Sequence, residues 1–488
     1  MTAGALVAGA PLVRMETRPG RPVPSAWVQR SDAQARQDVP RGQKWVASWR
    51  ASPHGPYPSG NPSAQPALES VFVTPSEGAS DQTFRLIIKP DLWGSMVRIR
   101  FTNTFGTRPL TVDGAFVGLQ TSGGNIAAGT NRPLTFDGGH ARVVVPAGTA
   151  TYTDPVVLPF AGSADLTRLD GRKLTVSFHV VDTTGPMTWH AKALTTSYVT
   201  PPAGGSHGGD ESDAAFANTT TSWYFVDAVD VIAPEATTVV ACFGDSITDG
   251  TGSTLNGDDR WPDVLSQRLH RAYGSRVAVV NAGIGGNRVI GPAAYTSDAP
   301  FAGGPSALAR LERDVLGIPG LSTVIWLEGI NDISNGATAA AIIDGFKEGV
   351  KRLRARGIRV IGATILPALG AAGPGGTAAA DAQRQEVNAF IRSSGVFDGV
   401  ADFDAVIRDA KTGELRAAFQ PGSTIGGPGD HLHPNRAGYQ AMGNSIDLSL
   451  LISSSPSSRL SLSHLPCFQR SGLSPFFSRA LAAAACSA

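Results

Sequence analysis

The sequence predicts an antiparallel β-sandwich-like domain followed by a three-layer α/β/α domain with a five-stranded parallel sheet. From about residue 45 to 235, short runs of alternating apolar and polar residues are separated by Gly, Pro, Asn and Asp, which is typical of antiparallel strands. Beyond residue 235, strand-like apolar runs alternate with helical periodicity, which predicts a parallel sheet with helices on both faces. A chain of 488 residues is long enough for two such domains, each with its own core.

Period-two alternation is clearest in two segments of the first half. Segment 96–101 (MVRIRF) places apolar residues at every second position, and segment 174–180 (LTVSFHV) repeats the pattern. The polar, Gly-rich segment 201–222 predicts a loop, and segment 223–226 (WYFV) predicts the last strand of this domain. We place the domain boundary at residues 233–235 (APE), so that the β domain spans 45–235.

The second half, residues 236–452, predicts five strands and five helices. The strands are expected at 238–243, 277–281, 322–328, 358–364 and 399–403. The helices are expected at 261–273, 305–316, 339–356, 380–394 and 436–447. Five parallel strands in this alternation suit a flavodoxin-like order.

The two ends of the chain predict little order. Residues 14–44 are rich in Arg, Pro, Gln and Ser, and residues 1–44 predict a disordered leader or the remnant of a signal peptide. The early apolar stretch lacks a basic region before it, so we do not expect an intact signal peptide here. Residues 453–488 hold many Ser and Leu and no Asp or Glu, which predicts a disordered tail, with a non-native origin kept open.

Composition excludes several classes of partner. The formal net charge is +1, from 41 basic and 40 acidic residues, which gives no electrostatic reason to expect nucleic acid or an anionic membrane as a partner. No apolar run reaches the 18 residues of a membrane-spanning helix, so stable membrane insertion is not expected. Three cysteines exclude a disulfide framework.

One serine stands where an α/β sheet presents its reactive groups. Segment 239–250 (VVACFGDSITDG) runs from a buried, β-rich stretch into Gly244, Asp245 and Ser246. Because open parallel sheets bind ligands at the carboxyl ends of their strands, we expect the Ser246 hydroxyl at that edge. A serine hydroxyl is a poor nucleophile at neutral pH, so it needs a general base and a partner that orients the base.

A base and its partner are found near the C-terminus. In segment 429–435 (GDHLHPN), Asp430 precedes His433 by three residues, just before a predicted helix. Such a turn lets the carboxylate hold the imidazole and select its tautomer. The neighbouring His431 makes a His-x-His pair beside Asp430, so a metal site is the alternative interpretation. No further cluster of ligand residues accompanies it, and we expect no metal and no cofactor.

Two other predicted strand ends offer hydrogen-bond donors for an oxyanion. Segment 281–287 (NAGIGGN) follows the second strand of the sheet, and its glycines allow a backbone N–H to approach a substrate closely. Segment 326–332 (WLEGIND) ends the third strand, and the side-chain amide of Asn331 is a second candidate donor.

These segments resemble the four sequence blocks of the SGNH or GDSL hydrolase superfamily, over roughly residues 236–450. The resemblance implies Ser246 as nucleophile, His433 as general base and Asp430 as its orienting partner. It implies an oxyanion hole made of the Ser246 N–H, the Gly286 N–H and the Asn331 side chain. Gly283 and Gly285 are alternatives to Gly286.

Further features are similar to a two-domain bacterial subgroup of this superfamily. They are the β domain itself and segments 259–262 (DRWP) and 384–388 (RQEVN). That subgroup includes arylesterase-like and xylan-associated acylhydrolases. From the resemblance and the low charge we expect a secreted or periplasmic protein.

Three more residues are candidate substrate contacts: Asp245, Trp261 and Glu328. For Asp245, a turn or helix-capping role is the alternative. For Trp261, the alternative is that it only starts a helix together with Pro262.

Together these observations predict a serine esterase that acts on carboxylic esters with short acyl, aryl or carbohydrate acetyl groups, as small molecules or polymers. An O-acyltransferase could use the same residues with a sugar as acceptor in place of water. A polysaccharide-binding protein whose β domain contacts the glycan, with an acetyl esterase domain attached, is the other alternative.

Overall fold

The computed structural model describes residues 39–72, 74–162 and 166–452. Most of the predicted leader and the whole predicted tail, 453–488, lie outside these residues. Within the described ranges, no helix combines the length and the apolar character that crossing a membrane requires. The described residues up to Leu451 pack as one compact unit. The division into domains at residue 235 therefore stays a prediction, and we use "β part" for residues 43–234 and "α/β part" for residues 238–451.

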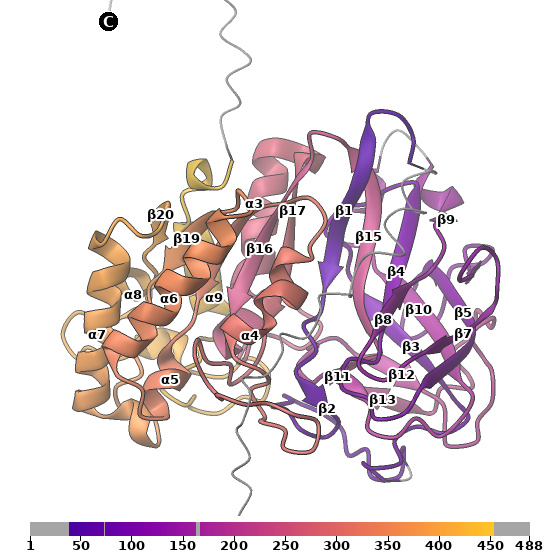
Figure 1. The fold of residues 1–488 in the computed structure, drawn as a ribbon, viewed down its shortest axis with the longest axis horizontal. Coiled ribbons are helices and arrows are strands. Elements are labelled where there is room, and N and C mark those ends of the chain that lie inside the picture. The colour runs from indigo at the N-terminus through magenta and orange to yellow at the C-terminus, as the bar shows by residue number, and fades with distance from the viewer. Residues whose placement is uncertain (1–38, 73, 163–165, 453–488) are drawn as a thin grey trace, which may run out of the picture. The chain divides into compact units, whose positions relative to one another are not determined.

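The β part is built from antiparallel sheets, as the alternation predicted (Figure 1). One sheet has the order β1-β15-β4-β8 with β9 beside β4, a second has β13-β12-β3-β10-β5-β6 with β7 beside β5, and a third has β14-β11-β2. The strands are β1 (Gln43–Arg50), β2 (Gly55–Pro56), β3 (Gln82–Ile88), β4 (Met96–Thr102), β5 (Leu110–Leu119), β6 (Arg132–Leu134), β7 (Arg142–Val145), β8 (Ala150–Tyr152), β9 (Val156–Val157), β10 (Leu174–Val180), β11 (Thr188–His190), β12 (Ser197–Val199), β13 (Asn218–Thr220), β14 (Trp223–Tyr224) and β15 (Val226–Pro234).

Aromatic side chains join the first two sheets face to face. Phe178 of β10 stacks on Phe84 of β3, with ring centroids 5.3 Å apart, and meets the edge of Phe101 from β4 in the other sheet at 5.2 Å. All three rings are fully buried. This contact between inward-facing residues of two sheets is the packing of a β-sandwich.

The last strand of the β part is longer than the sequence indicated. Trp223–Tyr224 form β14, but a separate strand, β15, then runs from Val226 to Pro234 and pairs with both β1 and β4. Its apolar pattern is interrupted by buried Asp230, which accepts hydrogen bonds from Arg50 and Arg98 at 2.8 and 3.1 Å. A buried carboxylate inside a central strand breaks the alternation that marks a strand in the sequence.

The α/β part contains the predicted five-stranded parallel sheet, in the flavodoxin-like order β17-β16-β18-β19-β20. Its strands are β16 (Thr238–Gly244), β17 (Val277–Gly283), β18 (Leu321–Leu327), β19 (Arg359–Ala363) and β20 (Gly399–Ala401). Its helices are α2 (Ser246–Asp249), α3 (Trp261–Tyr273), α4 (Ala307–Leu311), α5 (Ile330–Ser334), α6 (Ala339–Arg354), α7 (Ala378–Ser393), α8 (Phe403–Ile407) and α9 (Arg436–Ser445).

Helices cover both faces of this sheet (Figure 1). Helices α4, α6 and α7 pack beside one another on one face, and α3, α8 and α9 pack on the other. The segment of β16 before Gly244 is buried on both faces, which is why it reads as an uninterrupted apolar run. Thr338 and Thr377 cap the amino ends of α6 and α7 through their side chains and satisfy backbone N–H groups there.

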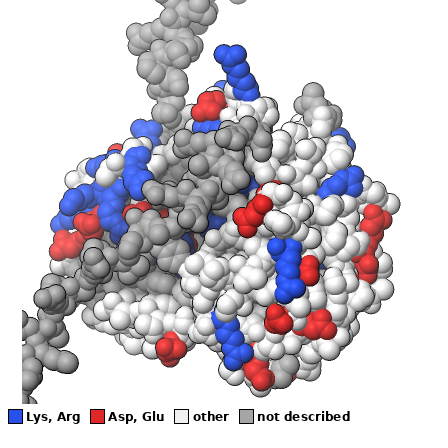
Figure 2. Space-filling model, turned by 45° about the vertical axis from the view of Figure 1, so that its right-hand side comes forward, with Lys and Arg blue, Asp and Glu red and all other residues white. Residues whose placement is uncertain are grey.

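The β part contacts the edge of the parallel sheet. Strand β1 lies alongside the edge strand β17 (Figure 1). The N–H of Ala47 in β1 donates to the carbonyl of Pro319, just before β18, at 3.0 Å. On the face shown in Figure 2, acidic and basic side chains lie among a larger uncharged area, in keeping with the near-neutral formal charge.

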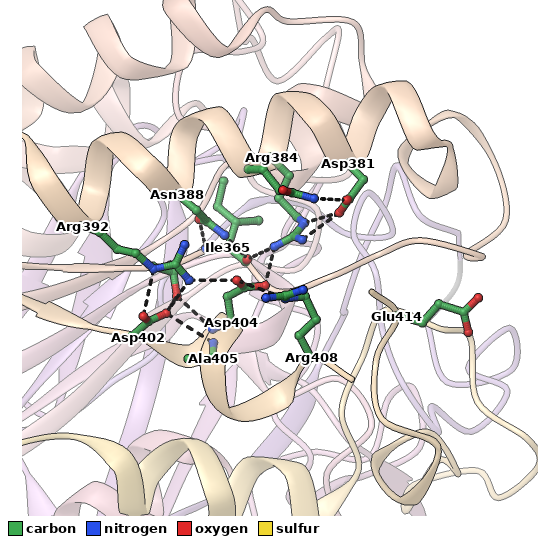
Figure 3. Close-up of polar contacts among 12 residues, drawn as sticks. Ile365, Asp381, Arg384, Asn388, Arg392, Asp402, Asp404, Ala405, Arg408 and Glu414 are labelled. Carbon is green, nitrogen blue, oxygen red and sulfur yellow. Dashed lines mark hydrogen bonds and ion pairs between the residues drawn. The ribbon is translucent and has the colours of Figure 1, made fainter. Parts of the chain in front are cut away.

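A buried network ties α7 to the turn after β19 and to α8 (Figure 3). Arg384 of α7 donates to Asp404 at 2.6 Å and to the carbonyl of Ile365 at 2.9 Å. Asn388, one turn later, donates to the same carbonyl at 2.8 Å and accepts from the Ile365 N–H at 2.7 Å. Segment 384–388, which the sequence singled out by resemblance, therefore holds the backbone after β19 in place.

Replacing Arg384 by methionine should lower the free energy of unfolding by about 3–5 kcal/mol, because it removes the fully buried guanidinium that pairs with Asp404 and one of the two side-chain donors to the Ile365 carbonyl. Urea unfolding measures the loss. The matched control is Arg354→Met, which breaks an ion pair with Asp398 whose arginine side chain is 43% exposed. That change should cost no more than about 1 kcal/mol. Equal losses in the two variants would contradict a structural role for the buried network.

Candidate active site

The end of β16 presents Ser246 at the carboxyl edge of the parallel sheet. Gly244 ends the strand, and a side chain there would lie 2.2 Å from the Leu327 carbonyl of the neighbouring strand. Asp245 then caps α2 by accepting the N–H of Ile247 at 3.0 Å. Gly250 ends α2 with φ of 106°, a backbone conformation that favours glycine. Ser246 is thus the first residue of a single helical turn held rigidly at both ends.

The structure brings Ser246, His433 and Asp430 into one hydrogen-bonded chain. Ser246 Oγ lies 2.7 Å from His433 Nε2, and His433 Nδ1 lies 2.6 Å from Asp430 Oδ2. Because a carboxylate only accepts, Nδ1 carries the proton and Nε2 presents its lone pair to the serine hydroxyl. The arrangement is that of a nucleophile, a base and a group that orients the base.

Asp430 is kept ionised by the donors around it. Its Oδ1 accepts the backbone N–H groups of His433 and Leu432 at 2.8 and 3.0 Å. Burial acts to raise the pKa of this carboxyl, but the hydrogen bond and charge of His433 and the two backbone donors hold it well below its usual value. Its side chain remains 55% exposed, so the pair lies at the surface.

Two backbone donors near Ser246 have no protein acceptor. Within the described ranges, no hydrogen bond engages the N–H of Ser246 or the N–H of Gly286. Gly286 has φ of 82°, in the left-handed region, and follows the end of β17. That strand end lies beside the end of β16, because the Ile284 N–H donates to the Gly244 carbonyl at 3.0 Å. The two donors therefore belong to neighbouring strand ends.

Asn331 lies at the third strand end, at the start of α5. Its Nδ2 donates to the Asn287 carbonyl at 3.0 Å, in the loop that contains Gly286. An amide nitrogen carries two protons, so the second remains for another acceptor. Asp332 stabilises the same loop by accepting hydrogen bonds from the N–H groups of Val289 and Ile290 at 2.8 and 3.1 Å.

The three candidate substrate contacts are buried. Asp245 is 1% exposed, and burial raises the pKa of its carboxyl to about 7. Trp261 is fully buried in the core and packs on Phe403. Glu328 is fully buried and accepts the Trp326 indole N–H at 2.8 Å. Asp245 acts as a helix cap, and neither Trp261 nor Glu328 offers exposed surface to a substrate.

The metal alternative gains no support from the geometry. His431 sits beside Asp430 with φ of 63°, and its Nδ1 is buried without a hydrogen-bond partner. Across the ranges that the structure describes, no group of three or more His, Cys, Asp or Glu side chains could hold a metal ion.

Arg310 is a site-organising residue that sequence reasoning missed. Its guanidinium is fully buried and donates to the carbonyls of Gly244 and Ala282 at 2.9 and 2.8 Å and to Asn287 Oδ1 at 2.8 Å. Asp314, one turn later in the chain, pairs with it at 3.1 Å. The sequence offers only an Arg and an Asp four residues apart, the pattern of an ordinary surface pair.

Glu328→Gln should flatten the dependence of folding stability on pH. Burial raises the pKa of Glu328 to about 8, against about 4.3 in an unfolded chain. Between these values the folded protein keeps a proton that the unfolded chain releases, so wild-type stability falls as the pH rises from about 4 to about 8. Glutamine is neutral throughout and removes this contribution.

Urea unfolding at about pH 5 and about pH 8 tests this. Glu348→Gln, a change at a half-exposed side chain of α6, serves as the control and should keep the wild-type dependence. The same fall in stability in the Glu328 variant as in wild type would rule out this carboxyl as a source of the dependence.

Comparison with known proteins identifies one family. Residues 242–441 match the GDSL-like Lipase/Acylhydrolase family. No curated protein sequence matches the chain.

Several solved structures resemble part of this chain. A carbohydrate acetylesterase family member from Sinorhizobium meliloti is 20% identical, with 44% of this chain and 97% of that chain covered and a TM-score of 0.33. The aryl esterase of M. smegmatis is 20% identical, with 43% and 95% covered and a TM-score of 0.32. A member of the lipolytic protein G-D-S-L family from Veillonella parvula is 18% identical, with 43% and 95% covered and a TM-score of 0.30.

The family match spans β16 to α9 and so includes Ser246, Gly286, Asn331 and His433. Residues 242–441 therefore form a GDSL-like lipase/acylhydrolase domain within this chain.

Proposed function

We propose that this protein is a serine esterase that transfers the acyl group of a carboxylic ester to water through an acyl-enzyme. The observation that carries the proposal is the hydrogen-bonded chain from Ser246 Oγ through His433 to Asp430. The match of residues 242–441 to a lipase and acylhydrolase family supports the same reaction class.

In the first step, Ser246 Oγ attacks the ester carbonyl carbon while its proton passes to His433 Nε2. The carbonyl π electrons move to the oxygen, which becomes an oxyanion. Asp430 holds the ring orientation and stabilises the imidazolium that forms. The unengaged N–H groups of Ser246 and Gly286 and the amide of Asn331 would donate to the oxyanion.

In the second step, the tetrahedral intermediate collapses and the bond to the leaving alcohol breaks. The alcohol oxygen takes the proton from His433, and the acyl group stays on Ser246. Water then attacks the acyl-enzyme as His433 accepts its proton, and the carboxylic acid leaves as Ser246 regains a proton.

The exposure of the base and its partner supports small or surface-presented acyl groups as substrates. The His433 side chain is 16% exposed and that of Asp430 55% exposed, so this pair lies close to the surface. The cavity of about 80 Å³ between the β and α/β parts is lined by other residues, among them Trp49, Asp258 and Asn281. We propose short acyl, aryl or carbohydrate acetyl esters as the substrate class.

Ser246→Ala should abolish hydrolysis of p-nitrophenyl acetate, with a fall in kcat of about 10⁶-fold, because no other group can form the acyl-enzyme. The change removes one oxygen at a 6% exposed position, so the circular dichroism spectrum and Tm should stay close to wild type. Ser393→Ala, at a serine on α7 that bonds only within its own helix, is the matched control and should keep full activity. Wild-type turnover in the Ser246 variant would overturn the proposed function.

Asn331→Ala should lower kcat by about 10²–10³-fold, or about 3–4 kcal/mol in the barrier, with a smaller change in KM, because an oxyanion donor acts mainly in the transition state. Asn335→Ala is the control. Its amide donates to the Asn331 carbonyl at 2.7 Å, one helical turn further along, and it should have little effect on kcat. A loss below about 1 kcal/mol in the Asn331 variant would assign that amide to holding the Asn287 carbonyl alone.

A further inference from the structure

The two hydrogen-bonding groups of Gly285 are held by side chains from two different parts of the chain. The Gly285 carbonyl accepts from Nδ2 of Asn61, a residue of the β part, at 2.9 Å. The Gly285 N–H donates to Oδ2 of Asp249, the last residue of α2, at 2.8 Å. Gly285 precedes Gly286, whose N–H is one of the proposed oxyanion donors.

The bond from Asn61 sets the direction of that donor. A trans peptide is planar, so its C=O and N–H point in opposite directions. Fixing the Gly285 carbonyl therefore fixes the Gly286 N–H, which belongs to the same peptide plane. Two successive glycines have wide conformational freedom, so the plane needs bonds from outside the segment to hold it.

Asn61 and Lys192 pack closely against the two glycines, which limits how far the Gly285–Gly286 peptide can rotate. A Cβ atom on Gly286 would lie 2.7 Å from Asn61 Nδ2, and one on Gly285 would lie 3.3 Å from Asn61 Cβ. A Cβ atom on Gly285 would also lie 3.0 Å from Nζ of Lys192, a second residue of the β part. The β part thus covers the outer side of this peptide.

Asp249, which accepts the Gly285 N–H, is itself positioned by contacts with the β part. His190 Nε2 lies 3.1 Å from Asp249 Oδ1, and His190 Nδ1 lies 2.9 Å from the Ser52 carbonyl. Burial acts to raise the pKa of Asp249, but the charge and hydrogen bond of His190 and the charge of Lys192 lower it overall. Asp249 therefore stays a carboxylate that can accept the Gly285 N–H.

We propose that Asn61 is a positioning residue for the oxyanion hole: it holds the Gly285–Gly286 peptide so that the Gly286 N–H faces the site of the developing oxyanion. The inference rests on the proposed esterase function and extends it, because it makes the β part a structural component of the active site. Asn61 acts through the peptide, because its amide donates one of its two protons to the Gly285 carbonyl.

The test compares Asn61→Ala and Asn61→Asp with wild type in the full chain. With p-nitrophenyl acetate, Asn61→Ala should lower kcat about 10-fold, with KM unchanged within about twofold, because a misaligned donor weakens transition-state binding more than ground-state binding. Asn61→Asp should lose at least as much, since a carboxylate cannot donate to the Gly285 carbonyl.

A second readout is specific to the oxyanion. An aryl trifluoromethyl ketone forms a tetrahedral adduct with a reactive serine and carries a negative oxygen in the place of the oxyanion. Its inhibition constant should rise in Asn61→Ala by the factor by which kcat/KM falls. Asn218→Ala is the matched control, because that asparagine also donates to a backbone carbonyl, Val199, but within the β part. It should keep wild-type kinetics and inhibition.

Three results would overturn the positioning role. The first is that both Asn61 variants have the same kcat/KM and the same inhibition constant as Asn218→Ala. The second is a rise in KM alone, which would make Asn61 a substrate contact. The third is a lowered Tm with unchanged kcat per active site, which would make it only a packing residue. Activity retained in Ser246→Ala is a separate outcome that overturns the esterase itself, so the two failures are distinguishable.

Discussion

The buried guanidinium of Arg310 is the interaction on which the arrangement of the candidate site depends. It reaches the last carbonyl of β16 and a carbonyl near the end of β17, and it also holds Asn287 in the loop that follows. Parallel strands end side by side, but nothing in their ladder fixes the loops beyond them. A fixed, planar set of donors can join three such segments at once. The guanidinium is buried and paired with Asp314. Moving it away from these partners would leave an unpaired buried charge, which costs free energy, so the arrangement is rigid.

Carboxyl groups near the site show how surroundings decide protonation. Asp430 lies near the surface and accepts three donors, so its pKa is lowered and it remains an acceptor for His433. Asp245 is buried at the end of a strand, and its pKa rises to about 7. Both are aspartates within the two motifs of the candidate triad, yet desolvation dominates for one and hydrogen bonds dominate for the other.

The contacts of the β part with the strand-end loops link its fold to the proposed chemistry. Its first strand lies against the edge strand of the parallel sheet, and residues 52–61 and 190–196 meet α2 and the loop after β17. Asn61 lies in a loop of the β part, and His190 is the last residue of β11.

Local pattern was sufficient to predict much of the fold. An uninterrupted apolar run marked β16, because a strand buried on both faces has no polar side, and the alternation of strands with helices predicted a parallel sheet. Strand β15 was missed beyond Val226 because buried Asp227 and Asp230, each paired with arginines of other strands, break its alternation. Trp261 and Glu328 drew attention as polar or aromatic residues near motifs, but they are core side chains.

The sequence by itself determined which residues form the candidate nucleophile, base and orienting group, because each sits in a short motif whose turn chemistry is local. Asp430 and His433, for example, are three residues apart in one turn. Only the tertiary structure decided that His433 Nε2 lies 2.7 Å from Ser246 Oγ. It also decided that Arg310 binds backbone carbonyls at two strand ends, and that Asn61 and Asp249 bind Gly285. These contacts join residues far apart along the chain, and their partners are often backbone atoms, which carry no residue-specific signal in a sequence.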